Sequence, residues 1–193
     1  MYEIPITVEV NGQSYAIRNN GDFRMVLDCF VALNDTELQE NERVCAALII
    51  FYDGFEELED LKKFSNLEEA VKKMYWFFNC GREDNFEQEL PKLLDWEQDS
   101  QLISSAINKV AGKEIRLEPF VHWWTFMGYY AAIGNSALST VVGIRYKIVK
   151  QKKLEKWEKQ FKAENPQYFV WDSRTMEQRE MDELAKSLWN SGS

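Results

Sequence analysis

Residues 118–126 read Glu118-Pro119-Phe120-Val121-His122-Trp123-Trp124-Thr125-Phe126. This stretch contains the only histidine of the chain and two of its seven tryptophans. Pro119 suits the first turn of a helix, where its missing N–H removes no hydrogen bond. After it, Trp123, Phe126 and Tyr130 recur at helical spacing on one face. The stretch therefore predicts a helix whose aromatic face lies at the centre of the fold.

Another helix is predicted on each side of this aromatic helix. Residues 95–99 read Asp95-Trp96-Glu97-Gln98-Asp99, and they lead into an apolar helix that Gly112 ends. On the other side, Asn135 or Ser136 can cap a long helix that Pro166 ends. The first half of this last helix is apolar and its second half is rich in lysine.

The N-terminal half begins with a predicted hairpin followed by helices. Residues 6–10 and 13–17 alternate apolar and polar side chains, with Asn-Gly at residues 11–12 between them. Asn-Gly favours a two-residue turn, because both residues tolerate positive φ, and such a turn pairs Val8 with Tyr15. A lone hairpin is marginal in water, so it is expected to pack on the helices.

The fold class that follows is mainly α: a single-domain helical bundle with a short N-terminal β-hairpin and a long basic C-terminal helix. We assign residues 1–165 to the helical domain, with the hairpin in residues 1–18. Residues 166–193 are predicted to form a C-terminal tail with a short amphipathic helix around Leu184 and Leu188.

Charge is unevenly distributed along the chain. The net charge of −9 discourages non-specific binding of nucleic acid by the molecule as a whole. Residues 1–100 carry 22 acidic and 9 basic side chains, whereas residues 101–193 carry 10 acidic and 14 basic ones. This asymmetry can support head-to-tail homo-oligomers or a charged partner, although two solvated faces of one domain are the simpler interpretation.

Cysteine use and hydropathy indicate a soluble protein that stays where it is made. The three cysteines, Cys29, Cys45 and Cys80, form no Cys-x-x-Cys unit and suit reduced thiols. No signal-peptide pattern begins the sequence. The longest apolar run, residues 120–133, is too short to cross a bilayer, so no membrane association is expected.

Asp95 and Asp99 are candidates for a polar site. Four residues apart on a helix, they could bind a metal or share a proton, but acids at a helix start also act as caps. Capping is the favoured interpretation, since His122 is the only histidine available as a further ligand. We predict that His122 hydrogen-bonds Asp95 or Asp99, and that these residues and Arg145 form a polar latch between three helices.

Catalysis and cofactor binding find no support in the sequence. Cys80 or Ser104 could serve as a nucleophile beside His122, but no Gly-x-Ser-x-Gly or similar context surrounds either. Neither of the two glycine-rich nucleotide-binding motifs, Gly-x-x-x-x-Gly-Lys-Ser/Thr and Gly-x-Gly-x-x-Gly, occurs in the sequence. We therefore expect no enzyme activity, no cofactor and no metal.

Residues 145–162 carry eight basic side chains, with Tyr146, Trp157 and Phe161 interleaved. Such a segment could bind nucleic acid by stacking and charge. Against this, Glu155 and Glu158 oppose the lysines four residues on, which is typical of an exposed helix, and Trp157 and Phe161 form an apolar pair suited to a protein groove. The candidate partner-binding residues are Lys153, Lys156, Trp157 and Phe161, with Trp171 and Trp189 as second choices.

Several of these segments together resemble the gene-product-fifteen family of tailed-phage proteins. The segments are Asp95-Trp96-Glu97-Gln98-Asp99, Gly112-Lys113-Glu114-Ile115, Val121-His122-Trp123-Trp124-Thr125-Phe126, Gly143-Ile144-Arg145 and Lys152-Lys153-Leu154-Glu155-Lys156-Trp157-Glu158. The resemblance covers residues 94–165 and is weaker in the N-terminal half. Val121 stands where the family pattern has leucine, and residues 113–115 depart from its turn.

The resemblance implies a tail-assembly protein, a non-enzymatic chaperone that binds the tape-measure protein or another tail protein in the host cytoplasm. The alternatives are a structural virion or head–tail connector component, and a nucleic-acid-binding protein that uses residues 145–162. A chaperone should be absent from purified particles, whereas a structural component should be present. Nucleic-acid binding should weaken steeply with salt.

Overall fold

The computed structural model describes residues 3–83 and 92–171 of the chain. Two strands and seven α-helices make up the regular structure of these residues: β1 (Thr7–Val10), β2 (Gln13–Ala16), α1 (Phe23–Asn34), α2 (Glu40–Phe51), α3 (Leu67–Phe78), α4 (Ser100–Ala111), α5 (Trp123–Ala131), α6 (Ala137–Val149) and α7 (Lys156–Glu164). Short 3-10 turns are η1 (Arg18–Gly21), η2 (Leu58–Lys63), η3 (Ile115–Leu117) and η4 (Pro166–Tyr168). The predicted mainly helical class with an N-terminal hairpin is confirmed.

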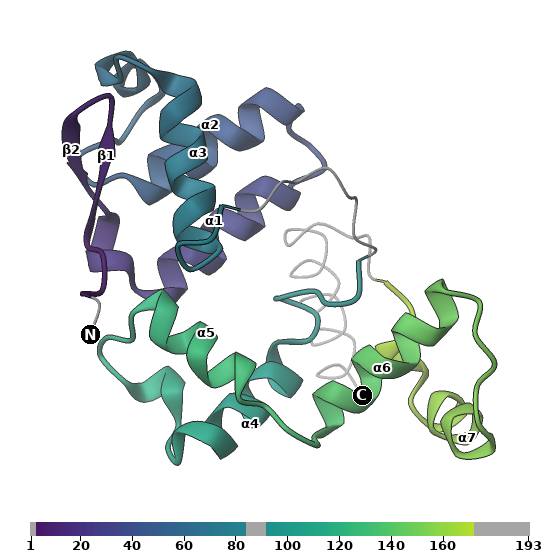
Figure 1. The fold of residues 1–193 in the computed structure, drawn as a ribbon. Coiled ribbons are helices and arrows are strands. Elements are labelled where there is room, and N and C mark those ends of the chain that lie inside the picture. Colours follow the sequence, from purple (N-terminus) through teal and green to yellow (C-terminus); the bar gives the residue numbers. More distant parts are fainter. Residues whose placement is uncertain (1–2, 84–91, 172–193) are drawn as a thin grey trace, which may run out of the picture.

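The hairpin has the predicted register. Val8 pairs with Tyr15 in an antiparallel ladder, and Asn11 and Gly12 turn the chain at φ 50° and 77°. Val8, Val10 and Tyr15 are buried, so one face of the hairpin belongs to the core. β1 packs on α3 (Figure 1). The helices thus cover the apolar face that a lone hairpin would expose.

Helix α5 joins the two halves of the molecule. Its Trp123 is 1% exposed and donates from Nε1 to the carbonyl of Phe78, at the end of α3. Phe126 stacks on Phe23 of α1 with ring centroids 4.6 Å apart. On the other side α5 packs against α4. One continuous aromatic core therefore spans both halves.

The predicted long C-terminal helix is wrong, because α6 ends at Val149 and α7 begins only at Lys156. Gln151 adopts φ 52°, and the N–H of Lys152 donates to the carbonyl of Lys147 at 2.7 Å. This hydrogen bond closes α6 in the manner of a Schellman motif. Figure 1 shows α7 as a separate short helix beside α6. Within the described residues, no helix has the length and apolarity needed to cross a membrane.

Candidate functional site

The centre of the C-terminal half is a buried ion pair between Arg145 of α6 and Asp99, which precedes α4. The guanidinium donates to both carboxylate oxygens, at 2.6 Å and 2.9 Å. Asp99 is 1% exposed and Arg145 4%. The structure therefore brings together two of the four residues of the predicted latch, in the bidentate geometry that makes such pairs strong.

Arg145 also holds two further segments. It donates from Nε to the carbonyl of Tyr168 at 2.8 Å and from Nη1 to the carbonyl of Leu93 at 3.0 Å. The ring of Trp171 lies over the guanidinium, 4.2 Å from its centroid. One side chain thus fixes the segment after α7 and the segment before α4 onto α6.

Asp95 lies next to this pair but acts differently. Its carboxylate accepts from the N–H groups of Glu97 and Gln98 and pairs with Lys92 at 2.7 Å. Its own N–H donates to Asp99 at 3.0 Å. Burial alone would raise the pKa of Asp95, but Lys92 and the two N–H groups outweigh it and hold the pKa below the usual value. Asp95 is therefore a turn cap beside the ion pair.

His122 does not join the latch, and its predicted hydrogen bond to Asp95 or Asp99 is absent among the described residues. Instead, Nδ1 accepts from the N–H of Trp124 at 3.1 Å, which caps α5. Nε2 lies 3.0 Å from the carbonyl of Pro5. These two contacts fit a neutral ring that carries its proton on Nε2. Burial lowers the pKa of His122, against the opposing effects of Pro5 and Asp22.

A second polar centre lies around Asp22, which the sequence offers, with Asn20, as a cap of the helix that begins at Phe23. Asp22 caps α1 by accepting from the N–H of Arg24, and its other oxygen accepts from the N–H of Val121 at 2.9 Å. Gly21, at φ 76°, sits so close that an added Cβ would lie 2.6 Å from the Phe77 ring and 3.0 Å from His122. The Asp22 side chain at a helix start was a detectable signal, but its partner lies 99 residues away.

The predicted partner-binding residues lie on or just before α7, at one end of the molecule (Figure 1). Lys153 and Lys156 are exposed, and Trp157 is 55% exposed. Phe161 is half-buried and packs edge-on against Phe169, with centroids 6.3 Å apart. We call Lys153, Lys156, Trp157 and Phe161 the α7 surface. Trp171 of the second choices is used by Arg145, and Trp189, Leu184 and Leu188 lie outside the described residues.

The α7 surface is held against α6 by one buried carboxylate. Glu158 is 4% exposed and accepts from Lys147 of α6 at 2.6 Å and from the N–H of Glu155 at 2.7 Å. Lys147 and this N–H lower the pKa of Glu158. The contact explains why Glu158 does not serve as an exposed partner of Lys162.

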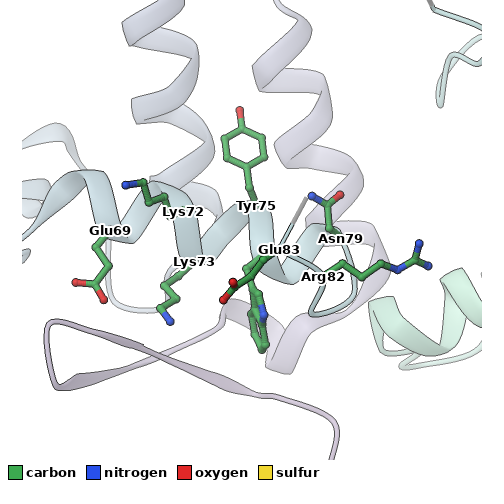
Figure 2. A pocket seen from close by; sticks show the side chains of 8 residues that line it. Glu69, Lys72, Lys73, Tyr75, Asn79, Arg82 and Glu83 are labelled. Carbon is green, nitrogen blue, oxygen red and sulfur yellow. The ribbon is translucent and has the colours of Figure 1, made fainter. Parts of the chain in front are cut away.

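A separate hollow of about 470 Å³ lies along the outer side of α3. Figure 2 shows Glu69 and Lys73 toward one end of it, Asn79 and Arg82 toward the other, and Tyr75 between them. Trp76 also lines it and packs edge-on against Trp124. Among the described residues, the lining mixes acids and bases, and contains no cysteine, serine or histidine. Elsewhere too, the described residues include no group of three or more potential metal ligands.

These observations define a mainly helical protein with a buried ion-pair centre and an exposed basic, aromatic surface at one end. The family described as "Bacteriophage Gp15 protein" matches residues 1–168, and the chain belongs to this family. The match extends over the N-terminal half, where the resemblance had been weaker. It makes the chain a phage-associated protein. No curated protein and no solved structure matches the chain.

Proposed function

We propose that this protein assists phage tail assembly as a non-enzymatic chaperone that binds the tape-measure protein, or another tail protein, in the host cytoplasm. The observation that carries the proposal is the α7 surface, where Trp157 is 55% exposed and directly follows Lys156, which is exposed like Lys153. A large aromatic side chain left in solvent beside cationic groups is typical of a protein-binding surface.

The packing of α7 supports a role in reversible binding. The helix has nine residues and is held to α6 through the Lys147–Glu158 pair, whose carboxylate is buried. A small surface of this kind suits modest affinity for each copy, so several copies along a long helical partner would bind together by avidity. Each copy could then leave when tail-tube subunits take its place.

A nucleic-acid-binding role is less well supported by the same segment. Of its eight basic residues, Arg145 is buried against Asp99 and Lys147 is paired with Glu158. Phe161 packs on Phe169 rather than standing free for base stacking. The positive charge and aromatic surface offered to phosphates and bases are thus smaller than the sequence suggests.

The test is co-expression with the tape-measure protein of the same phage, followed by pull-down and size exclusion. Trp157→Ala should weaken the complex about 30-fold, because truncating an interface tryptophan typically costs about 2 kcal/mol or more. Leu58→Ala is the matched control, since Leu58 is 65% exposed but lies in η2, outside the α7 surface. No complex, together with this chain at stoichiometric abundance in purified particles, would favour a structural virion component instead.

A further inference from the structure

An apolar groove runs along α6. It encloses about 430 Å³ and is lined mainly by six apolar or aromatic side chains: Leu93, Tyr130, Ile133, Leu138, Val142 and Tyr146. They come from the end of α5, the loop after it, α6 and the segment before α4. Figure 1 shows α6 between the α4–α5 part of the molecule and α7. The groove thus lies on the helix to which α7 is held by the Lys147–Glu158 pair.

The groove has the shape to receive a helix. Leu138, Val142 and Tyr146 are four residues apart on α6, so they form one row that spans about 12 Å. Ser139 and Gly143 lie next to this row and provide a floor of small residues. A Cβ added at Gly143 would meet no atom within 4 Å, so the space above it is open. A helical ridge of a partner can pack into such a row.

Positive charge lies at both ends of the groove. At one end, Lys152 Nζ lies 4.8 Å over the ring of Tyr146, and Lys150 follows α6 directly. At the other end, Lys109 donates to the carbonyl of Asn135, two residues after Ile133. In the part of the chain that the structure describes, no ion pair neutralises these three lysines, whereas nearby Asp99 and Glu158 are both paired. These lysines should favour an acidic ligand over a basic one.

We propose that this groove binds one amphipathic helix of the partner protein, with an apolar stripe that enters the groove and acidic side chains that border the stripe. The identity of the partner rests on the proposed function, but the chemistry of the helix does not. Apolar residues at positions i, i+4 and i+7 would cover Val142 and its row. Acidic residues at the stripe's ends would face Lys109 and Lys152.

The ligand test uses designed, fluorescein-labelled helical peptides and the full chain. One peptide carries a leucine stripe flanked by glutamates, and a second replaces each glutamate by lysine. Fluorescence anisotropy should give micromolar affinity for the glutamate peptide and at least about tenfold weaker affinity for the lysine peptide at low salt. Equal affinities of the two peptides would overturn the proposed charge selectivity. If neither peptide binds, the groove is not a binding site for an amphipathic helix.

The site test uses Gly143→Trp, which fills the open space in the groove. It should weaken binding of the glutamate peptide at least about tenfold. Ala137→Trp is the matched control on the same helix, at an exposed position outside the groove lining, and should bind like the unaltered chain. Gly143→Ala checks folding, because it leaves the groove nearly open and should raise the melting temperature. Unchanged binding by Gly143→Trp would refute the site.

Two other occupants are tested by a photo-crosslinking amino acid in place of Gly143. A crosslink to residues 172–193 of the same chain, or to a second copy, in the absence of peptide would overturn the proposal. A crosslink to the glutamate peptide supports it. If that peptide binds but neither the tape-measure protein nor another tail protein of the phage does, the proposed function is refuted and the proposed groove site is retained. If the tape-measure protein binds equally to Gly143→Trp and the unaltered chain, the groove is not its binding site, and the proposed function is retained.

Discussion

At the scale of single residues, Arg145 connects four partners with one side chain. Its guanidinium meets the carboxylate of Asp99, the carbonyls of Leu93 and Tyr168, and the ring of Trp171. All of these contacts are made at a side chain that is only 5% exposed. A buried pair of this kind contributes little net stability over apolar residues, but losing one partner leaves an uncompensated charge.

Asp99→Asn should therefore destabilise the fold by about 3 kcal/mol, because Arg145 would stay buried without a counter-charge. Arg145→Met should also destabilise it, since Asp99 and two backbone carbonyls lose their donors. The double variant Asp99→Asn with Arg145→Met should cost less than the sum of the two single changes. Urea denaturation measures all three, and additive effects in the double variant would contradict the coupling.

His122 gives a prediction about pH. Its folded-state pKa lies below the usual 6.5 because the ring is buried, so the unfolded chain takes up a proton first as pH falls. Stability should be fully present above about pH 6.5 and decline as the pH decreases from there toward the folded-state pKa. His122→Asn keeps a side-chain cap for α5 and should remove this part of the pH dependence. A comparison of urea midpoints at pH 7.5 and 5.5 checks it, and equal declines in the two proteins would contradict it.

Single residues also show what the sequence could and could not predict. Asp99 and Arg145 were proposed together, and their opposite charges in an apolar setting left few other arrangements. His122 was assigned to the wrong partner, because its contact is the carbonyl of Pro5, 117 residues away and without any side-chain signature. Every residue carries a backbone carbonyl, so residue type, periodicity and charge could not identify Pro5 as the partner of His122.

At the scale of elements, the hairpin could be predicted from local sequence, whereas the break between the C-terminal helices could not. The Asn-Gly turn is a local preference of two adjacent residues, so the register followed from the sequence alone. The end of α6 depends on Gln151 in a left-handed conformation, which a non-glycine residue rarely adopts. It also depends on the Lys147–Glu158 pair, which forms only once the chain has turned back. No helical propensity signals such a break in a run of charged residues.

The position of α7 should therefore depend on Glu158. Glu158→Gln removes the charge that pairs with Lys147, so α7 should separate from α6 more often. Hydrogen exchange of residues 156–164 should become several-fold faster, while the exchange of α4 and α5 stays the same. Lys159→Gln, an exposed change on the same helix, is the control. Unchanged exchange in Glu158→Gln would show that other contacts hold α7.

At the scale of the whole molecule, the two halves of the chain differ in net charge but share one hydrophobic core. The described residues up to Glu83 contain 16 acids and 8 bases, whereas residues 92–171 contain 8 acids and 12 bases. Figure 1 places the hairpin and α7 at opposite ends. Between them, α5 contributes Trp123 and Phe126 to the aromatic core that includes Phe23 of α1 and Phe78 of α3. The two oppositely charged parts should thus unfold together.

Phe126→Ala tests whether the two halves unfold together, because Phe126 is 3% exposed and stacks on Phe23 across the junction between them. The change should cost about 3–5 kcal/mol through lost burial and the cavity left behind. Unfolding followed by far-UV circular dichroism and by tryptophan fluorescence should still give coincident, single transitions at a lower urea concentration. Two separated transitions, with the part before residue 84 melting apart from the rest, would mean that α5 joins two independently stable units. A single shifted transition would place the cooperative unit across α5, so damage at this junction would weaken the support of the α7 surface as well.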